Sequence, residues 1–132
     1  MRRTIKMVRA FLIATIGLMT VTCQASAESW HAAEGPCLDW TGTWEVNQSG
    51  PGTWTGRINY RHTGGDCIGP HDTPFSANVN VQFGGEVWTA QRLHSSDGND
   101  CQYGGTVQGT QLVGQYHCRN GGPYKIKIDR GH

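Results

Sequence analysis

The stretch CQYGGTVQGTQLVGQYHC, residues 101–118, decides the fold class. When this stretch is folded about Gly109-Thr110, like residues face each other across the chain. The facing pairs are Val107 with Leu112, Gly105 with Gly114, Tyr103 with Tyr116, and Cys101 with Cys118. A two-residue turn with glycine at its first central position is a type II′ turn, which suits antiparallel strands. The stretch therefore predicts a β-hairpin.

The same hairpin predicts a disulfide between Cys101 and Cys118. Counting outward from the turn, these two residues reach a non-hydrogen-bonded site, where Cα atoms lie about 4.5 Å apart. That spacing is within the range that a disulfide accepts. If Cys23 leaves with a signal peptide, Cys37 and Cys67 remain and are expected to pair, although the other connectivities of four cysteines stay open.

Alternation with a period of two recurs along the rest of the chain, and no segment after residue 27 shows a helical period. Residues 75–83 alternate apolar side chains with Ser, Asn and Gln, which is typical of a strand with one buried face. Gly84-Gly85 then predicts a turn that places Val81 opposite Trp88. We predict an all-β fold, a single antiparallel meander of seven or eight strands. It is expected to form a small barrel with two disulfides. Seven strands follow from the patterns, and an eighth would lie in the loops or near residue 40.

The first 27 residues have the organisation of a secretory signal peptide. A basic start is followed by an apolar run over residues 10–21 and by the small residues Ala25-Ser26-Ala27. A short membrane anchor and a lipoprotein attached through Cys23 are the alternatives. We expect a signal peptide at residues 1–27, an N-terminal arm at 28–38 and a β-barrel-like domain at 39–132. The mature protein is expected to be secreted or periplasmic.

Removal of the signal peptide changes the charge balance. Four of the 11 Lys and Arg residues would leave with it and none of the 10 acidic residues, so the formal charge becomes −3. An acidic domain is a poor partner for nucleic acid, because phosphate backbones require a basic surface. The same balance argues against a membrane surface. We therefore expect no nucleic-acid partner, and no membrane partner after signal removal.

No catalytic or metal-binding motif stands out. The six histidines form no H-x-H or H-E-x-x-H pattern, and no serine lies in a G-x-S-x-G sequence. The acidic stretch over residues 97–100 lacks the spacing of an EF-hand calcium loop and is more typical of a turn. We expect no catalytic residue, no metal, no cofactor and no enzymatic activity.

Aromatic residues are the enriched feature of the chain. The alternation predicts that several of them share the inward face. The candidate ligand-binding residues are Trp44, Trp54, Tyr60, Trp88, Tyr103 and Tyr116. They form either a packed core or the wall of a cavity for a small ligand. The inward glycines Gly56, Gly105 and Gly114 either relieve crowding or leave room for that ligand.

Gly42-Thr43-Trp44 at the opening of a predicted strand resembles the G-x-W start of the calycin barrels. These include lipocalins, avidins and bacterial inhibitors of serralysin-type metalloproteases. The resemblance implies that Trp44 closes one end of a barrel and that Arg130 packs across it. Similarity to the inhibitors also implies an arm, here residues 28–38, that enters a protease cleft.

These patterns lead to two functional expectations. The first is an exported, non-enzymatic binding domain that holds a small apolar or glycan ligand through its aromatic residues. The alternative is a secreted inhibitor of a hydrolase or protease, acting through the N-terminal arm or the loop at residues 62–73. The expected partner is thus a small molecule, a glycan or a secreted hydrolase.

Overall fold

The structure, a computed structural model, describes residues 26–62 and 74–131. Eight strands account for most of these residues. The strands are β1 (Ala27–Gly35), β2 (Trp40–Gly50), β3 (Thr53–His62), β4 (Phe75–Gly84), β5 (Val87–Leu93), β6 (Cys101–Gln108), β7 (Gln111–Cys118) and β8 (Gly121–Asp129). The described part of the chain contains no helix long and apolar enough to cross a membrane.

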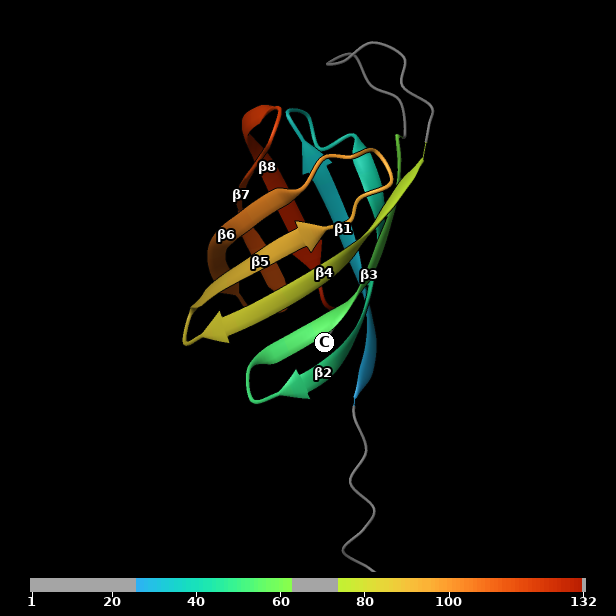
Figure 1. The fold of residues 1–132 in the computed structure, drawn as a ribbon. Coiled ribbons are helices and arrows are strands. Elements are labelled where there is room, and N and C mark those ends of the chain that lie inside the picture. The colour runs from blue at the N-terminus through green and yellow to red at the C-terminus, as the bar shows by residue number, and fades with distance from the viewer. Residues whose placement is uncertain (1–25, 63–73, 132) are drawn as a thin grey trace, which may run out of the picture.

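The strands form a closed antiparallel barrel in which each strand pairs with the next along the chain (Figure 1). Closure comes from β1, which pairs with β2 on one side and with β8 on the other. The predicted all-β meander is therefore confirmed. Closure also removes free strand edges, which would otherwise be open to pairing with other chains.

The β6–β7 hairpin has the predicted register, with Cys101 opposite Cys118 and Gln108 opposite Gln111. Gly109 has a φ of 63°, whereas Thr110 has no positive φ, as a type II′ turn requires. The predicted disulfide is present, with 4.0 Å between the two Cα atoms. The second predicted disulfide stays a prediction, because Cys67 lies outside the described residues.

The predicted register of the β4–β5 hairpin is wrong, because the turn lies one residue later in the sequence than predicted. The turn lies at Gly85-Glu86, so Val81 faces Ala90 and not Trp88. A type II′ turn needs glycine only at its first central position, and Gly85 supplies it with a φ of 70°. This register places Phe83 opposite Trp88 and leaves Glu86 in the turn.

Residues 28–38 are not an arm in front of the barrel. Most of this segment is β1, whose Trp30 is fully buried and whose Ala32 is 5% exposed. Burial of an indole is strongly favourable because of its large apolar area. The eighth strand is therefore β1, and it lies neither in the loops nor near residue 40, where β2 begins.

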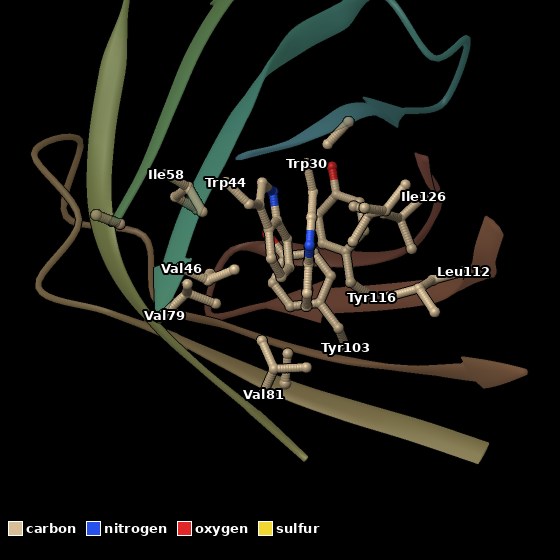
Figure 2. Close-up of a cluster of buried hydrophobic side chains, with 14 of the residues drawn as sticks. Trp30, Trp44, Val46, Ile58, Val79, Val81, Tyr103, Leu112, Tyr116 and Ile126 are labelled. Carbon is tan, nitrogen blue, oxygen red and sulfur yellow. The ribbon is translucent and has the colours of Figure 1, made fainter. Parts of the chain in front are cut away.

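The barrel interior is filled by side chains from all eight strands. Figure 2 shows the Trp30 and Trp44 rings at the centre of this core, with Val46 and Val79 on one side and Leu112 and Ile126 on the other. The indole N–H of Trp44 donates to the Tyr60 hydroxyl over 2.7 Å. A buried indole therefore has its hydrogen-bond partner, as a stable core requires.

The inward glycines relieve crowding between strands. A Cβ atom on Gly105 would overlap the Val113 carbonyl oxygen, and one on Gly56 would overlap that of Glu45. A Cβ atom on Gly114 would overlap the carbonyl oxygen of Gly104. Glycine here permits close backbone approach, and the space it leaves is occupied by neighbouring strands and is not free for a ligand.

One end of the barrel, here called the closed end, is covered by Arg130. Its guanidinium carbon lies 4.9 Å from the Trp30 ring centroid, 5.6 Å from that of Trp54 and 5.0 Å from that of Phe83. Such stacking of a cation on aromatic faces is favourable. The expectation that Arg130 packs across Trp44 is wrong, because the tryptophan rings beneath Arg130 belong to Trp30 and Trp54. Trp44 instead donates a hydrogen bond to Tyr60.

Candidate functional site

The opposite end of the barrel, the upper end in Figure 1, carries the β1–β2, β5–β6 and β7–β8 connections. A pocket of about 440 Å³ opens there, and we call it the mouth pocket. Its lining residues are Glu34, Gly35, Pro36, Trp40, Phe75, Arg92, Asp97, Asn99, Tyr116, Cys118, Asn120 and Tyr124. Its size lies within the range of about 300–1,000 Å³ that is usual for small-ligand sites.

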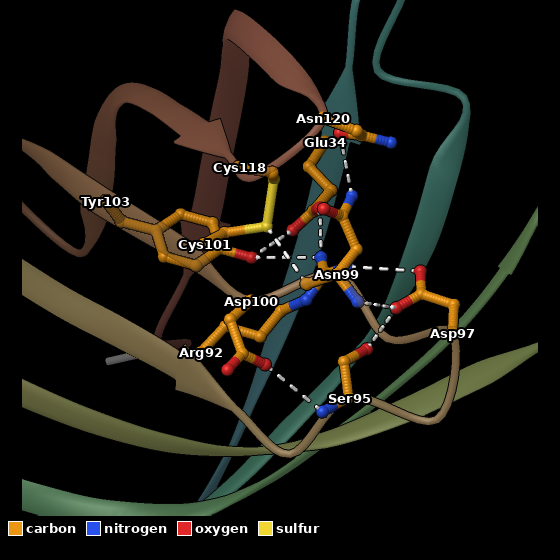
Figure 3. The surroundings of a disulfide bond; sticks show 10 residues. All are labelled: Glu34, Arg92, Ser95, Asp97, Asn99, Asp100, Cys101, Tyr103, Cys118 and Asn120. Carbon is orange, nitrogen blue, oxygen red and sulfur yellow. Dashed lines mark hydrogen bonds and ion pairs between the residues drawn. A yellow bond between two sulfur atoms is a disulfide. The ribbon is translucent and has the colours of Figure 1, made fainter.

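The floor of the mouth pocket is a buried ion pair. Arg92 Nη1 donates to Glu34 Oε2 over 3.2 Å, and both residues are only 2% exposed. Tyr103 donates its hydroxyl hydrogen to Glu34 Oε1 over 3.0 Å, as Figure 3 shows. The two charges come from the next-to-last residues of β1 and β5, because both strands end their inward alternation at this end of the barrel.

Burial dominates the protonation behaviour of this floor. It raises the pKa of Glu34, and the opposing attraction of Arg92 and hydrogen bonds from tyrosines do not cancel it. Burial also raises the pKa of Tyr60, Tyr103 and Tyr116, so these phenols remain protonated donors. Arg92 keeps its charge, because a guanidinium is not deprotonated in proteins.

The rim of the mouth pocket is polar and held by hydrogen bonds between loops. Asn99 Nδ2 donates to Asn120 Oδ1 over 3.0 Å, which joins the β5–β6 loop to the β7–β8 turn. Arg92 Nη2 donates to Asp97 Oδ2 over 3.3 Å, and this bond ties the rim to the floor (Figure 3). The adjacent disulfide fixes the β6 and β7 ends. A rim braced in this way is preorganised.

Aromatic rings form the walls of the mouth pocket. The Trp40 and Phe75 ring centroids lie 5.3 Å apart, and those of Tyr116 and Tyr124 lie 5.4 Å apart. The Arg92 guanidinium carbon lies 4.3 Å from the Phe75 centroid. The pocket therefore combines apolar faces with charged and amide groups in a small volume.

The predicted ligand-binding residues fall mainly inside the packed core. Trp44, Trp54 and Trp88 are at most 6% exposed and line none of the three pockets described in this section. Tyr60 and Tyr103 contribute to the surroundings of Glu34. Of the six, Tyr116 alone lines the mouth pocket among the described residues.

The sequence analysis missed Glu34, Arg92 and Trp40 as site residues. Arg92 carried a detectable signal, because it continues the inward alternation of Trp88 and Ala90 and so places a charge on an apolar face. Glu34 has the same position in β1, but the sequence predicts an arm at residues 28–38 and so gives Glu34 no inward position.

Two further concavities lie on the outside of the barrel. The larger, of about 960 Å³, crosses the outer faces of β8, β1, β2, β3 and the start of β4, and we call it the outer groove. The smaller, of about 290 Å³, lies over β4, β5 and β6 and is lined mainly by Asn, Gln and Thr side chains. Neither contains a buried charge.

Within residues 26–62 and 74–131, no group of three His, Cys, Asp or Glu side chains is arranged to hold a metal ion. Comparison of this chain with protein-family models, with curated proteins and with solved structures gave no match.

Proposed function

We propose that the mature chain is an exported, non-enzymatic binding domain that holds a small, uncharged, partly apolar ligand, such as a short glycan, in the mouth pocket. The observation that carries this proposal is the combination of aromatic walls with a fixed polar floor in a pocket of about 440 Å³. Small-ligand sites are typically built from apolar surface with a few well-placed polar groups.

The charges of the mouth pocket favour an uncharged ligand. Glu34 and Arg92 compensate each other, and Asp97 adds one negative charge at the rim. An anion would be repelled by this balance. The amides of Asn99 and Asn120 can both donate and accept hydrogen bonds, as a ligand with hydroxyl groups requires. A sugar offers such hydroxyls at its edge and an apolar face for Trp40.

The arrangement supports binding without chemistry. A general acid or base must come within hydrogen-bond distance of its substrate. Glu34 is 2% exposed and already accepts hydrogen bonds from Arg92 and Tyr103, so its carboxyl group braces the floor. Export is supported by the Cys101–Cys118 disulfide, since disulfides persist in oxidising compartments.

Because the barrel interior is packed with side chains, we place the ligand contacts in the mouth pocket and not in the core. Trp40, Phe75 and Tyr124 take the role first expected of the inward tryptophans. The alternative of a hydrolase inhibitor loses its arm, because residues 27–35 form β1. Its second element, the loop at 62–73, falls outside the described residues except for His62.

Tryptophan fluorescence offers a test, because Trp40 is partly exposed in the mouth pocket whereas the other four tryptophans are buried. The ligand is first identified by native mass spectrometry of the protein purified from its own exported fraction. Titration of this ligand into the protein is expected to change the tryptophan emission of the wild type but not that of Trp40→Phe. Asn120→Ala should weaken binding, up to about tenfold for a lost hydrogen bond.

Gln91→Ala, on the outer face of β5, is the matched control and should bind as the wild type does. An emission change that persists in Trp40→Phe would place the ligand elsewhere and would contradict the proposal.

A further inference from the structure

We propose that the outer groove is a second binding surface, and that it takes an acidic polysaccharide, a chain of sugars carrying carboxylate or sulfate groups. The outer groove lies on the outside of the barrel and shares only Phe75 with the mouth pocket. The inference therefore does not depend on the function proposed for that pocket.

Strand register places two cations at opposite sides of the groove. Lys127 on β8 is opposite Ala33 on β1, Ala33 is opposite Thr41 on β2, and Thr41 is opposite Arg61 on β3. Three steps between neighbouring strands separate the two cations by about 14 Å. Only the small side chains of Ala33 and Thr41 lie between them in this row, so a ligand chain can approach the sheet closely.

Both cations are available for a ligand. In the described part of the chain, neither Arg61 nor Lys127 makes a side-chain hydrogen bond or an ion pair. By contrast, Arg92 and Arg130 are both engaged with carboxylates.

The next row of the groove supplies polar groups. It runs from Asp129 through His31, Thr43 and Asn59 to Ser76. With neutral His31, the charged lining residues Arg61, Lys127 and Asp129 give the groove a formal charge of +1. The expected mature chain carries −3, so the groove is a locally positive area on an acidic domain. The Asp129 carboxylate accepts a hydrogen bond from the Gly131 backbone, which occupies one of its oxygens.

The chemistry of the groove favours a sugar polymer over the other anionic polymers. A peptide usually adds as a strand to a free sheet edge or inserts apolar anchors, and a closed barrel offers no edge. A nucleic acid needs several cations or aromatic stacking platforms, and the groove presents two cations. The Thr43, Asn59 and Ser76 side chains in the row beside the cations match the hydroxyl groups of a glycan.

The test is isothermal titration of the mature protein with a hexamer of galacturonic acid at low salt, with maltohexaose and hexaglutamate as neutral and peptide comparisons. We expect the acidic sugar alone to bind, and its affinity to fall at high salt. Arg61→Gln and Lys127→Gln should each weaken binding about two- to fivefold, as loss of an exposed ion pair predicts. Lys125→Gln, an outward cation of the same strand outside the groove, should have less effect.

All three substitutions are at exposed positions, so thermal unfolding is expected to show unchanged folding. The inference is overturned if the acidic hexamer does not bind, if hexaglutamate binds equally well, or if Lys125→Gln weakens binding as much as the groove variants do.

Discussion

Single residues set the properties of the mouth pocket, and Glu34 illustrates this most clearly. A carboxyl group at the last inward position of β1 is placed among tyrosines and one arginine, away from water. Burial of a charge is costly even when it is paired. The pKa of Glu34 is raised because burial disfavours the charged form of its carboxyl group, and this effect can be measured through the pH dependence of stability.

The stability of the protein should depend on pH through Glu34. Its pKa is raised in the folded state, so its contribution to stability is full below the unfolded pKa and is lost as pH rises through the folded pKa. The test is denaturant unfolding of wild type and Glu34→Gln from pH 4 to 8. We expect the free energy of unfolding of the wild type to fall, relative to that of the variant, as pH rises. The loss is at most about 1.4 kcal/mol per pH unit between the two pKa values.

Glu45→Gln provides the control for the change in net charge, because Glu45 lies on the outer face of β2. If the free energy of unfolding of the wild type, relative to that of Glu34→Gln, stays constant or increases as pH rises, the pKa of Glu34 is not raised by its burial.

At the scale of elements, the glycines at a turn decide whether the register of a hairpin can be predicted from the sequence. The β6–β7 hairpin has one glycine at its turn and a cysteine pair that fixes the register. The β4–β5 hairpin has two adjacent glycines, and either could begin the turn. Local sequence does not separate the two choices. In the structure the turn begins at Gly85, and Phe83 lies opposite Trp88.

Substitution of the two adjacent glycines distinguishes the registers. Gly85 has a φ of 70°, which an alanine adopts only with strain, so Gly85→Ala should cost about 1–2 kcal/mol. Gly84 has no positive φ and open space at its Cβ position, so Gly84→Ala should change stability by less than about 0.5 kcal/mol. Urea unfolding of both variants measures the difference. If both variants lose the same stability, or if Gly84→Ala loses more, the result would support a turn at Gly84-Gly85.

Much of the fold could be predicted from the sequence, but β1 and the site could not. The strong alternation of residues 75–83 and the paired hairpin of residues 101–118 depend on local patterns, and both were predicted as strands. The β1 alternation is weak, because Ala33 faces outward and Glu34 faces inward. An ion pair between residues 34 and 92 forms only when the barrel closes, so no local pattern indicates it.

At the scale of the whole molecule, closure makes every strand necessary. Because β1 pairs with both β2 and β8, removing it would leave two open edges and expose the core around Trp30. An open barrel loses both its hydrogen-bonded ladder and its protection against association.

Deletion of residues 28–34 is therefore expected to unfold the domain. Loss of buried Trp30 alone should cost about 3–5 kcal/mol, a large part of the 5–15 kcal/mol typical of small proteins. Circular dichroism and size-exclusion chromatography should show loss of the cooperative transition and aggregation. If the truncated chain still unfolds cooperatively as a monomer, residues 28–34 act as an arm after all.

The ion pair between Glu28 and Arg130, 3.6 Å long, brings the two ends of the barrel's chain together beside the closed end. A short linker could join them, so that circular permutants with new termini in a hairpin turn become feasible. For immobilisation, a tether attached beside Glu28 or Arg130 would anchor the closed end to the support and present the mouth pocket to the surrounding solution.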